Sequence, residues 1–160
     1  MRIAHPIPPL YDEDSTVLVL GSFPSVKSRE QGFFYGHPQN RFWKVLSAVF
    51  EDPLPGTVEE KKAFLLKNHV ALYDVIASCE ITGSSDASIR NVVPADLLPI
   101  LKTAKIRRIY CNGGKAFELY RKYQLPVTGT DAFRLPSTSP ANAALSLDQL
   151  VSIWSVIRES

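Results

Sequence analysis

The feature that most constrains the fold is an alternation of short apolar runs with segments of helical periodicity. Residues 16–21 (TVLVLG), 70–76 (VALYDVI) and 106–112 (IRRIYCN) are apolar and rich in β-branched side chains, which is typical of strands buried on both faces of a parallel sheet. A last strand is predicted to begin at Phe133 and to run into a loop. We therefore expect an α/β fold, a three-layer α/β/α sandwich around a central, mostly parallel four-stranded sheet.

The intervening segments predict the helical layers. Apolar side chains recur at helical spacing after Asn40, at Phe42, Trp43, Leu46, Val49 and Phe50. We expect Phe42 and Trp43 to anchor this helix in the core. The sequences TVEE (57–60) and SLDQ (146–149) have the pattern of capping boxes, which mark the start of a helix. Further helices are predicted over 94–103 and 113–123.

A length of 160 residues is that of one domain. Residues 1–15 are rich in proline and polar residues, so we expect an N-terminal arm there and a single domain over 16–160. Ligands of parallel α/β sheets bind beyond the carboxyl ends of the strands. The loops that follow strand ends, residues 21–39, 77–93 and 136–145, should therefore converge and form the site.

Several common kinds of site are excluded. The segment NGGKA (112–116) lacks the first glycine and the final Ser or Thr of a P-loop, and neither G-x-G-x-x-G nor G-x-S-x-G is present. The histidines lie on separate predicted elements, and Cys79 and Cys111 are too far apart for a zinc or cluster spacing. Two cysteines also cannot supply the four thiolates of an iron–sulfur cluster. We expect no metal site, and two buried, reduced thiols.

The charge pattern bears on location and partners. No apolar run is long enough to span a membrane, and residues 1–15 lack the pattern of a signal peptide. We therefore expect a cytoplasmic protein, nucleoid-associated if prokaryotic. The net charge is only +2, but basic residues cluster within a short segment, at Lys27, Arg29, His37, Arg41 and Lys44. This cluster is either a nucleic-acid contact or an ordinary solvated face.

Three motifs carry a resemblance to a known family. The segments VLVLGSFPSVKS (17–28), GFFYGHPQNRFWKVL (32–46) and LPSTSPANA (135–143) occur in this order and resemble the uracil-DNA glycosylase superfamily. Within it, the pattern is similar to the hypoxanthine (deoxyinosine) DNA glycosylases and, more distantly, to the mismatch-specific uracil/thymine enzymes. The resemblance extends over about residues 16–157.

This resemblance implies a monomeric, monofunctional DNA glycosylase of base excision repair that needs no metal or organic cofactor. Its partner would be double-stranded DNA containing a damaged base. A base within a duplex cannot be attacked, so it must be flipped into a pocket. By its place in the motif, Tyr35 would be the aromatic platform on which the flipped base stacks.

The sequence also departs from the best-known members. They carry Asp or Asn two residues after the first-motif glycine, where this chain has Phe23, so no strong general base is expected in that motif. In the deoxyinosine branch, the asparagine of HPQNRFW is linked to activity, which implies a catalytic Asn40. The second motif begins with Ser137 in place of His or Asn. These departures favour hypoxanthine over uracil as the substrate.

Two of the candidate residues have a structural alternative. Asn is a favoured N-cap, and Asn40 stands where a helix begins, so capping alone would explain it. Asp74, at the end of the second strand, could contact the Watson–Crick edge of a purine, or it could accept backbone N–H bonds in the following turn. Neither alternative is decided by the sequence.

The other candidates surround these residues. Gly21, Ser22 and Phe23 are expected at the edge of the base pocket. Contacts with the DNA backbone are expected from polar and basic side chains, which fix register without reading sequence: Ser25, Lys27, Ser28, His37, Arg41, Ser137, Ser139 and Asn142. Leu145, or the segment 141–142, would fill the gap that the flipped base leaves.

Three functions remain open. The first is excision of hypoxanthine, and the second is excision of uracil or mismatched thymine. The third, from another class, is a nucleic-acid-binding module that has kept the fold and lost catalysis. A small-molecule-binding α/β protein is disfavoured, because no nucleotide-phosphate motif is present.

Overall fold

A parallel sheet forms the centre of the computed structural model, which describes residues 2–160. Its strands are β2 (Val17–Gly21), β3 (Val70–Asp74), β6 (Arg108–Asn112) and β7 (Ala132–Leu135). They lie in the order β3-β2-β6-β7, and every neighbouring pair is parallel. The predicted four-stranded parallel sheet is therefore confirmed.

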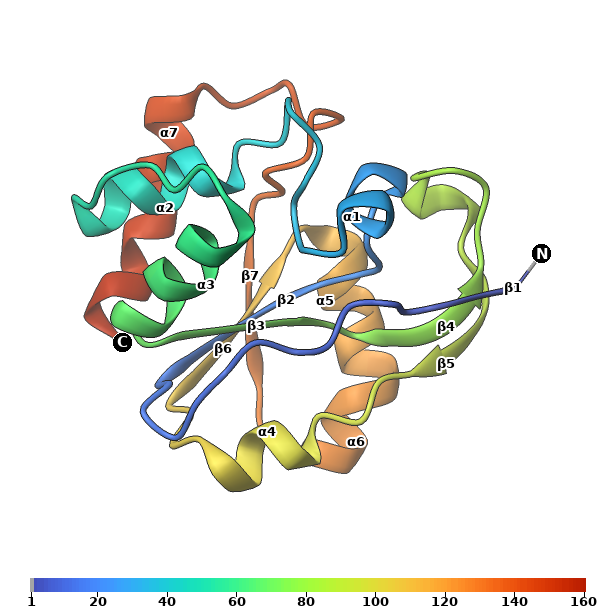
Figure 1. Cartoon of the computed structure of the whole chain (residues 1–160). Helices are drawn as coiled ribbons and strands as arrows, with labels where there is room; N and C mark the ends of the chain where they lie inside the picture. The colour runs from blue at the N-terminus through green and yellow to red at the C-terminus, as the bar shows by residue number, and fades with distance from the viewer. Residues whose placement is uncertain (1) are drawn as a thin grey trace.

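Helices cover both faces of this sheet (Figure 1). One layer consists of α2 (Phe42–Phe50), α3 (Val58–Lys67) and α7 (Leu147–Trp154), which the 3-10 turn η3 (Ser155–Glu159) follows. The other layer consists of α4 (Leu98–Thr103), α5 (Gly114–Leu119), the π-helical turn η2 (Tyr120–Gln124) and α6 (Leu125–Thr128). A short helix, α1 (Val26–Gln31), follows β2.

Alternate residues of β2 explain why both faces are covered. Val17 and Val19 point into the core beneath α2, α3 and α7, whereas Leu18 and Leu20 point into the core beneath α4 and α5. All four side chains are almost fully buried. Successive side chains of a strand point to opposite faces, so an uninterrupted apolar strand needs a helix layer on each side. The three-layer prediction is confirmed.

A second sheet was not predicted. It is antiparallel and consists of β1 (Arg2–Ala4), β4 (Ile76–Glu80) and β5 (Arg90–Pro94), in the order β1-β4-β5. The 3-10 turn η1 (Asp86–Ser88) lies between β4 and β5. The prediction of one strand over 70–76 and a loop over 77–93 is thus wrong.

The chain leaves the parallel sheet at Val75. The Val75 N–H donates to the Gly21 carbonyl (2.9 Å), and its carbonyl accepts from the Ala95 N–H (2.9 Å) and from the buried Gln124 amide (3.1 Å). β4 continues from this point into the smaller sheet (Figure 1).

The predicted arm is packed against the rest of the chain where it is described. β1 pairs with β4, and Leu10 forms an antiparallel bridge with Leu72. Between these points the Ile7 side chain is buried in the core. The division into an arm over 1–15 and a domain over 16–160 stays a prediction.

The helix starts agree in part with the sequence. Both capping boxes, Thr57 with Glu60 and Ser146 with Gln149, are present. The first long helix begins at Phe42 with Arg41 as its N-cap residue, slightly later than predicted. The helix predicted over 94–103 begins only at Leu98, because Pro94 still belongs to β5 and the Ala95 N–H donates to the Val75 carbonyl. No helix in residues 2–160 has the length and apolarity needed to cross a membrane.

Candidate active site

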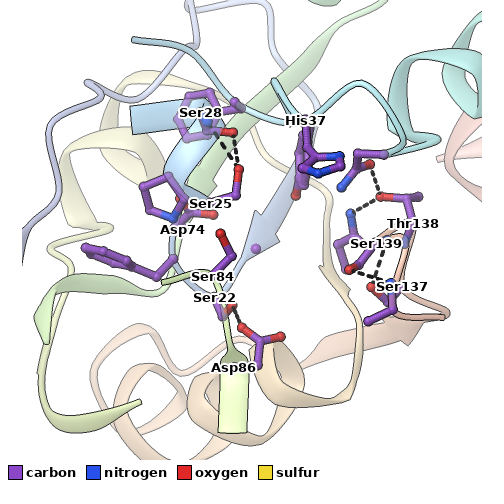
Figure 2. A pocket seen from close by; sticks show the side chains of 18 of the residues that line it. Ser22, Ser25, Ser28, His37, Asp74, Ser84, Asp86, Ser137, Thr138 and Ser139 are labelled. Carbon is purple, nitrogen blue, oxygen red and sulfur yellow. Dashed lines mark hydrogen bonds between the residues drawn. The ribbon is translucent and has the colours of Figure 1, made fainter. Parts of the chain in front are cut away.

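A pocket of about 320 Å³ opens beyond the carboxyl ends of β2, β3 and β6. This volume lies at the lower end of the range for small-molecule sites, which suits a single nucleobase. Figure 2 shows its lining, which combines apolar side chains with several hydroxyl groups and the two carboxylates of Asp74 and Asp86. The predicted site residues that line it are Gly21, Ser22, Phe23, Ser25, Ser28, Tyr35, His37, Asn40, Asp74, Ser137 and Ser139.

Gly21 ends β2 at the floor of this pocket. A Cβ atom at this position would lie 2.5 Å from Asp74 Oδ1 and 3.0 Å from the Tyr35 hydroxyl. Contacts this close would force both groups to move. A side chain here would therefore displace two of the groups that form the floor.

Tyr35 is held in place by its surroundings. Its backbone has φ of 52°, an uncommon conformation for a residue with a side chain. Its ring stacks on Phe42, with centroids 4.0 Å apart and planes at 19°, and its carbonyl accepts from the Trp43 indole (3.2 Å). Burial and, second, the Asp74 charge raise the pKa of the Tyr35 hydroxyl. Within residues 2–160 this buried hydroxyl has no hydrogen-bond partner.

Asn40 has a fixed amide. Its Oδ1 accepts from the Phe42 N–H (2.9 Å) and from the Thr138 hydroxyl (2.8 Å). The first bond is the capping interaction that the sequence allowed, although Arg41 is the N-cap residue. Because backbone N–H can only donate, Oδ1 must face the helix. The amide nitrogen has no protein partner in the part of the chain described here, and Asn40 lines the pocket.

Thr138 and Asn112 hold Asn40 from the other side. Thr138 is fully buried; its N–H donates to Asn112 Oδ1 (3.0 Å), and its hydroxyl accepts from Asn112 Nδ2 (3.0 Å). Both residues line the pocket, and the sequence interpretation missed both. Asn112 is the last residue of β6, so its place at a strand end was the available signal.

The pocket also contains a carboxylate that no sequence motif indicated. Asp86, on η1, accepts a hydrogen bond from Ser22 Oγ (2.7 Å), the residue next to the first-motif glycine. The first motif has no acid of its own, but a distant loop brings one to it (Figure 2). Burial raises the pKa of Asp86. This loop is tied to α1 because Ser84 Oγ accepts from the Val26 N–H (2.9 Å).

Asp74 is buried where β3 ends. The turn alternative required bonds from backbone N–H groups, but within residues 2–160 no backbone N–H donates to its carboxylate. Its partner is His5, whose Nε2 lies 2.7 Å from Asp74 Oδ2. His5 lies on the arm and was not among the predicted site residues.

The residues predicted to contact DNA fall into two groups. Ser25 caps α1, while Ser28 accepts from the Gly36 N–H (2.9 Å) and so holds the loop that carries Tyr35. Ser137 and Ser139 accept from backbone N–H groups of their own loop. These four serines line the pocket, as does His37, which accepts from the Gln39 N–H (3.1 Å). Each of the five side chains therefore forms a hydrogen bond within the protein and also faces the pocket.

Lys27, Arg41 and Asn142 do not line the pocket. Lys27 is exposed, with its ammonium 3.7 Å from Glu30. The Arg41 guanidinium donates to the carbonyls of Leu145 and Asn142, both at 2.8 Å. These bonds join the start of α2 to the loop over 136–145. Leu145, predicted to fill the duplex gap, is partly buried against the core.

Comparison with known proteins agrees with this geometry. The family model of the Uracil DNA glycosylase superfamily matches residues 8–158. The chain belongs to the uracil DNA glycosylase superfamily.

Similar proteins come from methanogens. The chain is 33% identical over 152 residues to the "Hypoxanthine DNA glycosylase" of Methanosarcina acetivorans, with 94% of each chain covered. It is 31% identical over 154 residues to the protein of the same name from Methanosarcina barkeri, with 92% of each covered. A solution NMR structure described as that of a "putative Uracil DNA glycosylase" from M. acetivorans superposes with a TM-score of 0.83, at 31% identity, over 99% of this chain and 97% of that one.

Proposed function

We propose that this chain is a monofunctional DNA glycosylase that excises hypoxanthine from double-stranded DNA. Family membership and the names of the two methanogen relatives support this activity. A pocket with the volume of a small-molecule site, at the strand ends where α/β sheets bind ligands, is in accord with it. We further propose that the protein works as a monomer in the cytoplasm, at the nucleoid if the cell is prokaryotic.

The observation that carries the proposal is the orientation of the Asn40 amide. Its oxygen is occupied by Phe42 and Thr138, so its N–H groups are the part left for a ligand. As the glycosidic bond breaks, negative charge develops on the departing base. Fixed donors aimed at developing charge are an effective source of catalysis, because they need no reorganisation during the reaction. Asn40 can therefore cap the helix and stabilise the leaving base at the same time.

Asp86 is the group that we assign to the attacking water. One of its oxygens is taken by Ser22, and the other is left for a second partner. In the hydrolysis, the water oxygen bonds to C1′ of the sugar as the bond from C1′ to the base breaks, and that electron pair leaves with the base. One water proton passes to the Asp86 carboxylate, and the base takes up a proton from solvent.

The test uses end-labelled duplexes that each contain a single hypoxanthine, uracil or mismatched thymine, and the purified protein in EDTA. We expect strand cleavage at hypoxanthine only after alkali, as for an abasic product of a metal-independent monofunctional enzyme. An undamaged duplex of the same sequence is the control.

Other outcomes would replace the proposal. Cleavage mainly at uracil or thymine would keep the enzyme class and change the substrate. Binding of all duplexes without cleavage of any would favour the nucleic-acid-binding module.

A further inference from the structure

His5 lies beneath the pocket although it belongs to the N-terminal arm. Its side chain is 2% exposed and that of Asp74 is 4% exposed. The imidazole is surrounded by Phe23, Phe34 and Tyr73, with ring centroids 5.7, 6.0 and 5.0 Å away. Its backbone N–H donates to the carbonyl of Ala77 in β4 (2.8 Å). The ring is therefore fixed by an apolar cage and by the small sheet.

Both ring nitrogens have a defined partner. Nδ1 accepts from the backbone N–H of Ile7 (3.1 Å), so it carries a lone pair and no proton. Nε2 must then carry the proton of the neutral ring and donate it to Asp74 Oδ2 at 2.7 Å. The arm thereby fixes one tautomer of His5, and this tautomer can only donate to Asp74.

This bond leaves Asp74 Oδ1 directed at the ligand side. Oδ1 lies over Gly21, where a Cβ would be 2.5 Å away, and Asp74 lines the pocket. Among residues 2–160, His5 is the hydrogen-bond donor that Asp74 has. A buried carboxylate stays ionised only if it is paired and hydrogen-bonded.

The other titratable groups around Asp74 are Tyr35 in the loop after α1, Tyr73 beside it on β3, and Asp86 on η1, on which the positive charge of Lys115 also acts. Among residues 2–160, no lysine or arginine forms an ion pair with Asp74. Burial and, second, the charge of Asp74 raise the pKa of both tyrosines, which keeps them neutral. Support for the Asp74 charge therefore comes from the His5 bond.

We propose that His5 is a positioning residue for base recognition: it holds Asp74 as an oriented acceptor that selects bases with a ring N–H beside a carbonyl. The inference rests on the proposed function. It adds how the enzyme distinguishes hypoxanthine from adenine, its parent base. Hypoxanthine presents N1–H on its Watson–Crick edge, which a carboxylate oxygen can accept. Adenine presents an N1 lone pair at the same place, which the carboxylate repels. A site built around one such bond strongly rejects the analogue that lacks the hydrogen.

Loss of the His5 donor should weaken this selection in a recognisable way. A buried carboxyl group that loses its hydrogen-bond donor is pushed toward its neutral, protonated form. The resulting carboxylic acid can donate to the adenine N1 and no longer repels it. Removal of His5 should thus lower hypoxanthine excision at neutral pH, restore part of it at alkaline pH, and narrow the margin over adenine.

The test compares His5→Phe, which keeps ring packing without a donor, with His5→Gln, whose amide can donate from a similar reach. Leu10→Ala is the matched control, because the Leu10 side chain packs the same arm against the core and makes no hydrogen bond to Asp74. Single-turnover excision of hypoxanthine and of adenine is measured across pH for each protein. For His5→Phe we expect a loss on the order of 100-fold at neutral pH, recovery as pH rises, and a smaller hypoxanthine-to-adenine ratio. His5→Gln should restore most of the rate, and Leu10→Ala should keep the wild-type pH profile.

Two results would overturn the proposal. One is a wild-type pH profile and base ratio in His5→Phe. The other is an equal change in His5→Phe and Leu10→Ala, which would mean that only arm docking matters. A readout independent of activity separates this inference from the proposed function. Nitrogen NMR of the wild-type protein should show the Nε2–H tautomer of His5, and titration should show binding of free hypoxanthine but not adenine. If the wild type excises no base, the proposed function fails, while these two measurements still decide the role of His5.

Discussion

Two substitutions of Asn40 separate its capping of the helix from its proposed role as a hydrogen-bond donor to the leaving base. Asn40→Ala removes both the amide oxygen and the amide nitrogen. Asn40→Asp keeps an oxygen for Phe42 and for Thr138 but removes the N–H groups left for the ligand. The cap and the proposed catalytic donor are therefore tested independently.

The expected changes in stability follow from the two hydrogen bonds that Asn40 Oδ1 accepts. In Asn40→Ala, the Phe42 N–H loses its acceptor at the start of α2, which costs about 1 kcal/mol by analogy with N-cap losses. The buried Thr138 hydroxyl also loses its acceptor, at a cost of about 1–3 kcal/mol. We expect Asn40→Ala to lower the free energy of unfolding by about 2–4 kcal/mol. Asn40→Asp should stay within about 1 kcal/mol of wild type, because a carboxylate near a helix N-terminus is favourable.

The effect of the two Asn40 substitutions on base excision should not follow their effect on stability. Loss of a fixed donor to a developing anion slows reactions by about 10²–10³, and the negative charge that Asn40→Asp introduces would add repulsion of the departing base. We therefore expect Asn40→Asp to be folded, to bind duplex DNA and to lose at least about 100-fold in single-turnover excision. Urea unfolding, DNA binding and excision of hypoxanthine are measured on the same preparations. Wild-type excision by Asn40→Asp would refute a catalytic donor and leave Asn40 as a cap alone.

Further predictions concern groups in and below the pocket. Asp86→Asn should lower excision by about 10²–10⁴, as expected for a lost general base. Because burial raises the pKa of Asp86, wild-type activity should fall as pH drops through that raised pKa, and the variant should lack this acid limb. Burial raises the pKa of Cys111 to about 12, and Cys79 is fully buried, so neither thiol should react with a disulfide reagent at mildly alkaline pH until the protein is unfolded. Rapid labelling of the native protein would contradict this burial.

The central sheet could be predicted because its signals are local. Uninterrupted apolar runs such as that over Val17–Gly21 indicate strands covered on both faces, and the loops after parallel strands must meet at one edge. This topology is why Gly21 and Ser137 could be expected together from the sequence, whereas Asn40 was expected there only from the family resemblance. The second sheet escaped prediction because β4 and β5 do not alternate regularly between buried and exposed side chains: in β4 only Ile76 and Cys79 are buried, and in β5 no residue is buried.

The missed residues share a different property. His5 meets Asp74 across 69 residues, and Ser22 meets Asp86 across 64. No periodicity or spacing in the sequence reports such pairs, because each is set by the docking of one loop or arm on another. Thr138 was overlooked for a simpler reason, since a threonine between two serines has no distinguishing chemistry until its buried bonds to Asn40 and Asn112 are seen.

Asn40 and Thr138 are 98 residues apart in the sequence. The hydrogen bond between them can therefore form only late in the synthesis of the chain. During synthesis, β2, Tyr35 and α2 emerge long before the segment that orients the Asn40 amide. A nascent or prematurely terminated chain ending before Thr138 would carry the aromatic surface without the oriented donor. On the proposed function, catalytic competence arises only near the end of translation, so incomplete products cannot cut bases from the genome that encodes them.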